Sequence, residues 1–157
     1  MNIKLITIGK TDNKNLQILI DDYIKRLSFY IKFDLEIIPY IKNVKNLNKS
    51  QQKEKEGELI LAKLTSSDHL ILLDENGKSF SSIGFSEELQ KKMNSGIKTL
   101  VFVIGGPYGF SDTLYKKANG KLALSAMTFS HQMVRLFFIE QIYRGFTILR
   151  NEPYHHQ

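Results

Sequence analysis

Residues 101–112, VFVIGGPYGFSD, contain the most apolar segment of this 157-residue sequence and close it with a glycine-rich turn. An apolar run that ends in glycines is typical of a buried strand whose carboxyl end meets a ligand. A phosphate, a dinucleotide and a structural turn without any ligand are all compatible with these residues alone. The elements on either side of the segment indicate which fold it belongs to.

Apolar β-branched runs and segments with helical spacing alternate along the whole chain. The strands are expected at residues 3–9, 33–40, 69–77, 97–109 and 121–127, and the helices at 14–31, 54–64, 79–96, 111–118 and 131–151. Ser86 is expected to cap the third helix and Gly96 to end it, and residues 42–55 are expected to form a mobile loop that leads into a helix. Such alternation predicts an α/β fold with a mostly parallel sheet flanked by helices, in one domain that spans residues 1–157.

The composition excludes several classes of protein. The hydrophobic fraction is 42%, no apolar run approaches a membrane span, and no signal peptide is evident at the start. Cysteine is absent, and the four histidines do not have metal-ligand spacing. We therefore expect a soluble, cytoplasmic protein that binds no metal and no membrane. The formal net charge of +6 favours a polyanionic partner, with a basic surface that binds nothing as the alternative.

The last helix, residues 131–151, carries apolar residues around nearly its whole circumference. A helix that is apolar on every side has to be buried on every side, and the sheet of a small domain covers only one of them. A second copy of the chain is the most economical cover for the rest, so the pattern predicts a homodimer. Burial by the domain's own helices is the alternative.

Three loops follow predicted strands, at residues 72–78, 104–109 and 122–131, and loops in these positions converge at the carboxyl edge of an open α/β sheet. A P-loop is excluded because Gly109 is followed by Phe and Ser instead of Lys and Ser or Thr. A dinucleotide fingerprint is excluded because the glycines lie late in the chain. Pro107 lacks an N–H, which argues against a nest of phosphate-binding amides. Gly105 and Gly106 are expected to let a flat, adenosine-bearing ligand approach the main chain.

A second, polar group of residues lies along the last predicted helix and in the tail after it. It comprises His131, Arg135, Glu140, Arg144, Tyr154 and His155. These residues could have no functional role: Glu140 and Arg144 would then form a salt bridge within the helix, and the tail after it would be frayed. An aromatic residue and a histidine beside a basic stripe are, however, also what stacking on a base and handling its proton require.

Three segments together carry a family resemblance: LVFVIGGPYG (100–109), LALSAMTFSHQMVRLFFIEQIYRGFTILRNEPYHH (122–156) and LLDENGK (72–78). The sequence resembles the bacterial ribosomal RNA large-subunit methyltransferase H family, which are pseudouridine N3 methyltransferases of the SPOUT class. The resemblance extends over essentially the whole chain, including the ITIGK start, the EKEGELIL helix and the NEPYH end. Each motif alone is weak, and their combination and order are specific.

The resemblance implies an α/β fold with a C-terminal deep trefoil knot, a rare exception to unknotted topology. It implies S-adenosylmethionine as methyl donor, a homodimer with the active site between subunits, and a pseudouridine of 23S rRNA in the assembled 70S ribosome as substrate. By matching position, the donor site comprises Leu73, Gly105, Leu124, Ser125, Ala126, Met127, Thr128 and Phe129. The substrate side comprises His131, Arg144, Tyr154 and His155.

For such a reaction the protein mainly positions two reactants, because the transferred methyl group is already activated. We expect His155 or His131 to handle the N3 proton and Tyr154 to orient the base. Arg135 and Arg144 are expected to hold phosphate or the developing anion. Two other classes make different predictions: an oxidoreductase would bind a nicotinamide cofactor, and a non-catalytic RNA-binding module would not bind S-adenosylmethionine.

Overall fold

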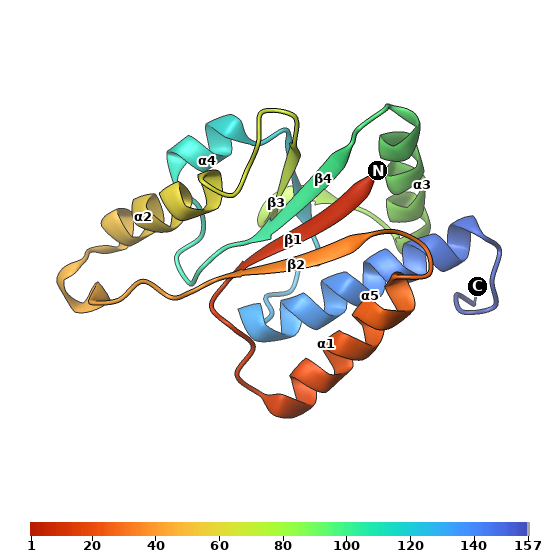
Figure 1. The fold of residues 1–157 in the computed structure, drawn as a ribbon, viewed down its shortest axis with the longest axis horizontal. Helices are drawn as coiled ribbons and strands as arrows, with labels where there is room; N and C mark the ends of the chain where they lie inside the picture. Colours follow the sequence, from red (N-terminus) through yellow and green to blue (C-terminus); the bar gives the residue numbers. More distant parts are fainter. Residues whose placement is uncertain (157) are drawn as a thin grey trace.

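The computed structural model describes residues 1–156, and Figure 1 shows a twisted sheet with helices on both faces. The strands are β1 (Asn2–Ile8), β2 (Phe33–Ile38), β3 (His69–Ser79), β4 (Thr99–Ile104) and β5 (Gly120–Ala123). The helices are α1 (Lys14–Leu27), α2 (Lys49–Leu61), α3 (Ser82–Asn94), α4 (Asp112–Lys117) and α5 (His131–Leu149), with a 3-10 turn, η1, at Val44–Asn46. The strand order is β2-β1-β4-β3-β5 and every pairing is parallel, which confirms the predicted α/β class.

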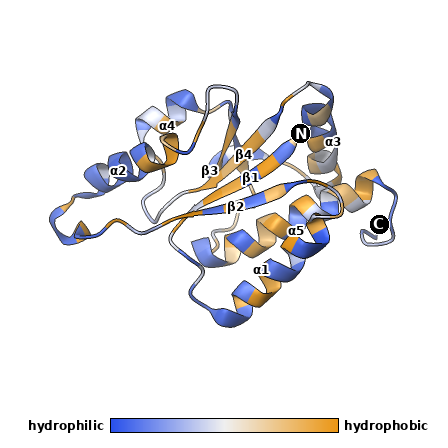
Figure 2. Ribbon diagram, viewed as in Figure 1, coloured by the Kyte–Doolittle hydropathy of each residue, from blue (hydrophilic) through white to orange (hydrophobic). Residues whose placement is uncertain are grey.

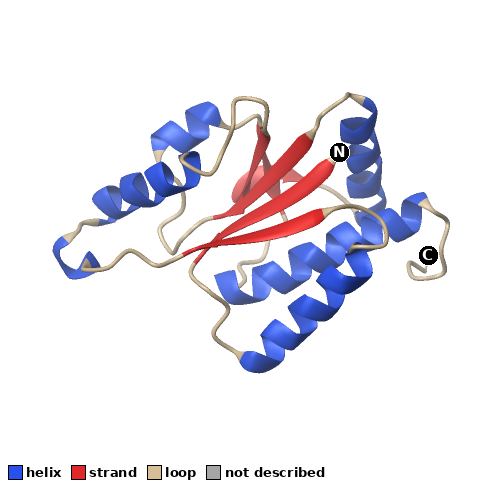
Figure 3. Cartoon of the chain, in the orientation of Figure 1, coloured by secondary structure: helices blue, strands red, loops and turns tan. Residues whose placement is uncertain are grey.

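The sheet separates two hydrophobic cores, because successive residues of its central strands point to opposite faces. On β4, Leu100, Phe102 and Ile104 pack toward α1, α3 and α5, whereas Val101 and Val103 pack toward α2 and α4. Figure 3 shows the same arrangement of helices around the sheet. Both faces of the central strands are covered, which agrees with the apolar, buried run from Leu100 to Ile104 in β4.

Helix starts are set by side chains that accept hydrogen bonds from free backbone N–H groups. The predicted cap Ser86 is wrong: Ser81 Oγ accepts from Gly84 N, and Ser86 lies buried within α3. Asn48 and Gln51 form a capping box, so α2 begins at Lys49, inside the segment predicted to be a loop. The predicted C-terminal stop at Gly96 is confirmed by a φ of 79° directly after α3.

The end of β3 runs directly against β5, where Lys78 pairs with Leu122 and Ser79 with Ala123. Leu73 and Lys78 of β3 both pair with Leu122, so the four residues between them loop out of the sheet. Gly77 lies so close that a β-carbon there would be 2.6 Å from the backbone nitrogen of Leu122. Only glycine permits this approach. β5 itself ends at Ala123, so the predicted strand at residues 121–127 continues as loop from Leu124.

Helix α5 lies across the sheet with α1 on one side and α3 on the other (Figure 1). Its residues Phe138, Ile139 and Ile142 are fully buried by these neighbours. The domain's own helices therefore account for much of the burial for which the sequence analysis invoked a second subunit. Figure 2 shows that apolar residues nevertheless recur along α5. Among the residues described, no helix combines the length and apolarity needed to cross a membrane.

Candidate active site

The bulged part of β3 and the loops that follow β4 and β5 surround a composite hollow, called here the loop cavity. It consists of two adjoining parts of about 160 Å³ and about 490 Å³ that share the side of Leu73, Asp74, Glu75, Phe129 and Val134. The smaller part is lined by Leu124–Phe129, and the larger part by Ile104–Phe110 and His131. Every residue that the sequence analysis assigned to the donor site therefore borders one cavity at the carboxyl edge of the sheet.

The two glycines of the β4 loop are required for a reason that the sequence analysis did not identify. A β-carbon at Gly105 would be 3.0 Å from the Phe110 ring, and one at Gly106 would be 2.7 Å from Oε1 of Glu56. The space vacated by the missing side chains is therefore filled by the protein itself. The backbone of the two glycines lines the loop cavity. The positions that their β-carbons would occupy are taken by Phe110 and Glu56.

Glu56 lies on α2 beneath this loop and is 3% exposed. Its Oε1 accepts a hydrogen bond of 3.0 Å from Gln52 Nε2, whereas its Oε2 is buried with no partner among the described residues. Burial raises the pKa of Glu56. Sequence reasoning missed this residue, although its spacing of four from the buried Ile60 placed a carboxylate on the buried face of the helix.

Carboxylates from the β3 loop give the loop cavity an acidic side. Asp74 accepts hydrogen bonds from the backbone N–H of Asn76 and from the Tyr115 hydroxyl. Burial, followed by this bond to Asp74, raises the pKa of Tyr115 to about 12, so its hydroxyl keeps its proton near neutral pH. Glu75 lies beside Asp74 in the lining of both parts of the cavity. The cavity thus combines apolar walls with negative charge, which suits an apolar ring attached to a cationic centre.

The residues at the far end of α5 form a second group, called here the C-terminal polar cluster: Tyr23, Glu140, Arg144, Tyr154 and His155. Glu140 is its centre, because it accepts hydrogen bonds from Arg144 and, at 2.8 Å, from the Tyr154 hydroxyl. The Arg144 guanidinium also lies 4.6 Å from the centre of the Tyr154 ring. The predicted salt bridge between Glu140 and Arg144 is confirmed.

The tail after α5 folds back onto the protein instead of fraying. Asn151 adopts a left-handed conformation with a φ of 54°, and the backbone N–H of Glu152 donates to Thr147. The Tyr30 hydroxyl donates to the Glu152 carboxylate. These contacts hold Tyr154 and His155 in place over α1 and α5.

Tyr154 is held in one protonation state by its surroundings. Burial and hydrogen bonds with Tyr23 and Glu140 raise its pKa strongly. Its hydroxyl therefore donates to Glu140, and the Tyr23 hydroxyl, 3.0 Å away, donates to the Tyr154 oxygen. Tyr23 comes from α1, 131 residues earlier in the chain, and sequence reasoning placed it only in an apolar stripe. Tyr154 can orient a partner, but it cannot serve as a base.

His155 also has a defined tautomer. Its Nδ1 lies 3.3 Å from Arg144 Nη1, and because a guanidinium only donates, Nδ1 must accept. The proton of the neutral ring then sits on Nε2, which is buried without a partner among the described residues. His155 therefore offers one free polar atom, its Nε2.

The two groups of predicted residues lie at opposite ends of α5. His131 lines the loop cavity, and Arg144 follows thirteen residues later, which corresponds to ~20 Å along a helix. One chain therefore does not bring His131 and the loop cavity together with Arg144, Tyr154 and His155. The prediction that Arg135 faces substrate is wrong, because it is 1% exposed and donates to Ile8 O at 2.9 Å and Thr11 Oγ1 at 3.1 Å.

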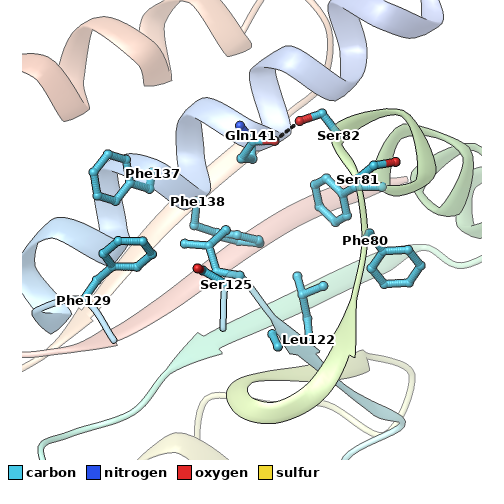
Figure 4. Close-up of a pocket in the computed structure, with 12 residues that line it drawn as sticks. Phe80, Ser81, Ser82, Leu122, Ser125, Phe129, Phe137, Phe138 and Gln141 are labelled. Atoms are coloured by element: carbon cyan, nitrogen blue, oxygen red, sulfur yellow. Dashed lines mark hydrogen bonds between the residues drawn. The ribbon is translucent and has the colours of Figure 1, made fainter. Parts of the chain in front are cut away.

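A further cavity of about 390 Å³ lies between α3, β5 and α5, on the other side of the 122–125 segment (Figure 4). Its walls include the aromatic rings of Phe80, Phe129, Phe137 and Phe138, and the Ser82 hydroxyl donates a hydrogen bond of 2.8 Å to Gln141 at one side. Phe137 and Met133 of α5 are 38% and 39% exposed, and Met127 is 76% exposed. The apolar residues of α5 that α1 and α3 leave uncovered thus gather beside the loop cavity.

The comparisons with known proteins agree with this geometry. The family model described as "Predicted SPOUT methyltransferase" matches residues 1–155. The chain belongs to the SPOUT methyltransferase family. Among its relatives, proteins named ribosomal RNA large subunit methyltransferase H are 86% identical in Flavobacterium johnsoniae, 65% in Christiangramia forsetii and 52% in Porphyromonas gingivalis ATCC 33277. Each comparison covers 100% of both chains.

A solved structure was also found, the SpoU methyltransferase AviRb from Streptomyces viridochromogenes in complex with the cofactor AdoMet. It is 11% identical with a TM-score of 0.46, and the match covers 91% of this chain and 57% of that one. The assignment to the SPOUT family depends on the family model and the full-length relatives instead. No group of three or more potential metal-ligating side chains occurs among residues 1–156.

Proposed function

We propose that this protein transfers a methyl group from S-adenosylmethionine to N3 of a pseudouridine in 23S rRNA, and that it acts on the assembled ribosome. The observation that carries the proposal is the identity of 86% over 100% of both chains with a protein named as a ribosomal RNA large subunit methyltransferase. The basic charge of +6 suits an RNA substrate.

The loop cavity fits the methyl donor. Leu73, Gly105 and the segment Leu124–Phe129 would hold its adenosine part by apolar walls and main-chain groups. Asp74 and Glu75 would face its positive charge. When bound, the donor supplies an activated methyl group on a sulfonium. The protein's own contribution is to position it and to exclude water.

The active site is proposed to form between two copies of the chain. The donor residues and the C-terminal polar cluster lie ~20 Å apart along α5, too far to act on one nucleotide. A second copy would bring its Arg144, Tyr154 and His155 to the loop cavity of the first. The exposed apolar side chains Met127, Met133 and Phe137 beside that cavity are the surface it would cover.

Within such a site, each polar residue has a role that follows from its contacts. Tyr154, whose hydroxyl proton is already donated to Glu140, would orient the base with its ring, and Arg144 would stabilise the negative charge of the base as the N3 proton leaves. His131 on the cavity side is the candidate for accepting that proton, because His155, with its own proton on Nε2 and its Nδ1 bonded to Arg144, has no free acceptor. The proposal includes the C-terminal trefoil knot that the family resemblance implies.

The test is methyl transfer from labelled S-adenosylmethionine to intact 70S ribosomes, followed by mapping of the modified nucleotide. A label on any nucleotide other than a pseudouridine of 23S rRNA would refute the assignment. Equal rates on naked rRNA and on ribosomes would refute the need for the assembled ribosome.

Subunit mixing tests the shared site. A variant with a defective loop cavity, Thr128→Trp, and a variant with a defective tail, Arg144→Ala, should each be inactive. Heterodimers would contain one site in which both halves are intact, so mixing should restore about a quarter of the wild-type rate. No restoration in a mixture shown to contain heterodimers would place both halves in the same chain.

A further inference from the structure

The segment that leads into α2, together with the first turn of that helix, projects from the body of the protein as an arm, visible at the left of Figure 1. We define the lysine arm as residues 42–53. It contains Lys42, Lys45, Lys49 and Lys53 and no acidic residue. Among the described residues, none of these four lysines takes part in a salt bridge. The arm therefore presents uncompensated positive charge.

Both ends of the arm are anchored at the carboxyl edge of the sheet. Before it, the Tyr40 ring lies over Gly9, where a β-carbon would be 2.7 Å from a ring carbon. After it, Gly57 packs against Ser111 at the start of α4. The capping box of Asn48 and Gln51, with hydrogen bonds of 2.8 and 3.0 Å, holds the turn into α2. The arm is thus positioned by the fold and is not an unstructured tether.

The arm reaches the loop cavity at one point. Lys49 Nζ lies 5.3 Å from the centre of the Tyr108 ring, in the loop that lines the cavity. Tyr108 is 43% exposed, so one face of an aromatic ring and a lysine are offered to solvent side by side. Lysines that hold phosphates next to an aromatic platform for a base are the usual means by which proteins bind single-stranded nucleic acid.

We propose that the lysine arm is an RNA-binding surface. Lys42, Lys45 and Lys49 bind backbone phosphates of the strand that leads into the loop cavity, and Tyr108 packs against a neighbouring base. The proposal depends on RNA being the substrate, as proposed above, and it assigns a site on this chain that grips the strand beside the reacting nucleotide. An acidic protein of the ribosome is the other possible partner, but it gives the exposed Tyr108 ring no role.

The experiment compares two triple variants with the same change of charge. Lys42→Gln/Lys45→Gln/Lys49→Gln removes the arm's exposed lysines. Lys32→Gln/Lys91→Gln/Lys98→Gln removes three exposed lysines at the opposite, amino-terminal edge of the sheet. Binding to unmethylated 70S ribosomes and to a naked 23S rRNA fragment is measured from about 50 to 200 mM salt. Calorimetry with S-adenosylmethionine checks that both variants keep their donor affinity.

The arm variant should bind both RNAs about tenfold or more weakly at the lowest salt. The slope of its plot of log affinity against log salt concentration should be smaller in magnitude by about 2. Each phosphate contact that is lost on a single strand reduces the magnitude of this slope by ~0.7. The control variant should change affinity less than about twofold. Equal losses of affinity in both variants would show that only the net charge of the protein matters, and this would overturn the proposal. A loss on ribosomes without a loss on the naked fragment would identify a protein partner and also overturn it.

Failure of the proposed reaction would look different. If the wild-type protein methylates no pseudouridine, the reaction assignment fails, but the salt slopes still decide whether the arm binds RNA.

Discussion

Replacing Gly106 by Ala tests the packing beneath the loop cavity. The new methyl group would lie 2.7 Å from Oε1 and 2.8 Å from Cδ of Glu56, several tenths of an ångström inside a normal contact. The Glu56 carboxyl cannot simply swing away, because it is 3% exposed and bonded to Gln52. Overpacking of this kind costs about 1–3 kcal/mol. For a domain of this size, that lowers the Tm by roughly 2–12 °C.

The assay combines thermal unfolding with calorimetric titration of S-adenosylmethionine, since the displaced loop also lines the cavity. Donor affinity should fall about tenfold together with the Tm. Gly84→Ala in α3 is the matched control, because its β-carbon would be 3.4 Å or more from any neighbour, an ordinary contact. It should be neutral or stabilise by up to ~1 kcal/mol, as alanine does in helices.

A double-mutant cycle isolates the contact. In a Glu56→Ala background the new methyl group has room, so the Gly106→Ala cost should shrink by at least ~0.5 kcal/mol. If Gly106→Ala costs the same with and without the Glu56 side chain, the clash is not its cause and the reasoning fails.

Three other changes are predicted from the same structure. Glu56→Gln should unfold at the same temperature as the wild type below about pH 4.5, where both side chains are neutral. Because burial raises the pKa of Glu56, the wild type should lose stability relative to the variant as the pH rises above that value. A difference in unfolding temperature that stays constant across the pH series would contradict this. Arg135→Met should destabilise by about 2–4 kcal/mol in denaturant unfolding, since it leaves the Ile8 carbonyl and Thr11 hydroxyl without their partner. Weaker ribosome binding by Arg135→Met at unchanged stability would restore the rejected substrate role. Tyr23→Phe should lower kcat about tenfold while S-adenosylmethionine affinity stays constant, because Tyr154 loses the hydrogen bond that orients it; an unchanged kcat would show that Tyr23 has no positioning role.

The order and type of the elements could be predicted because they depend on local patterns. The run VFVI before two glycines is a buried strand in any context that covers both of its faces, and β4 is such a strand. The end of α3 at Gly96 could be predicted from that residue alone, because glycine is free to adopt a positive φ. The prediction of Ser86 as the cap was wrong because other serines precede it, and Ser81 has the extended backbone that a cap requires.

The site was predictable in part. Segments 72–78, 104–109 and 122–131 could be grouped because loops at the carboxyl ends of parallel strands converge on one edge, whereas Leu73, Gly105 and residues 124–129 were assigned to the donor through the family resemblance. Arg135 could not be assigned correctly, since helical spacing gives it the same face as His131 but does not show that the β1 end closes over it. Tyr23 was indistinguishable from a core residue until α1 was placed beside the tail.

The sequence by itself therefore determined the alternating α/β pattern, the segments that line the loop cavity and, through its motifs, the methyltransferase family. These properties depend on residue types at fixed spacings, which the chain carries wherever it folds. Only the tertiary structure decided that Glu56 fills the space beneath Gly106 and that Tyr23 holds Tyr154. It alone separated His131 from His155 by the length of α5. Contacts between residues as many as 131 positions apart depend on how helices pack across the sheet, and no local pattern encodes that packing.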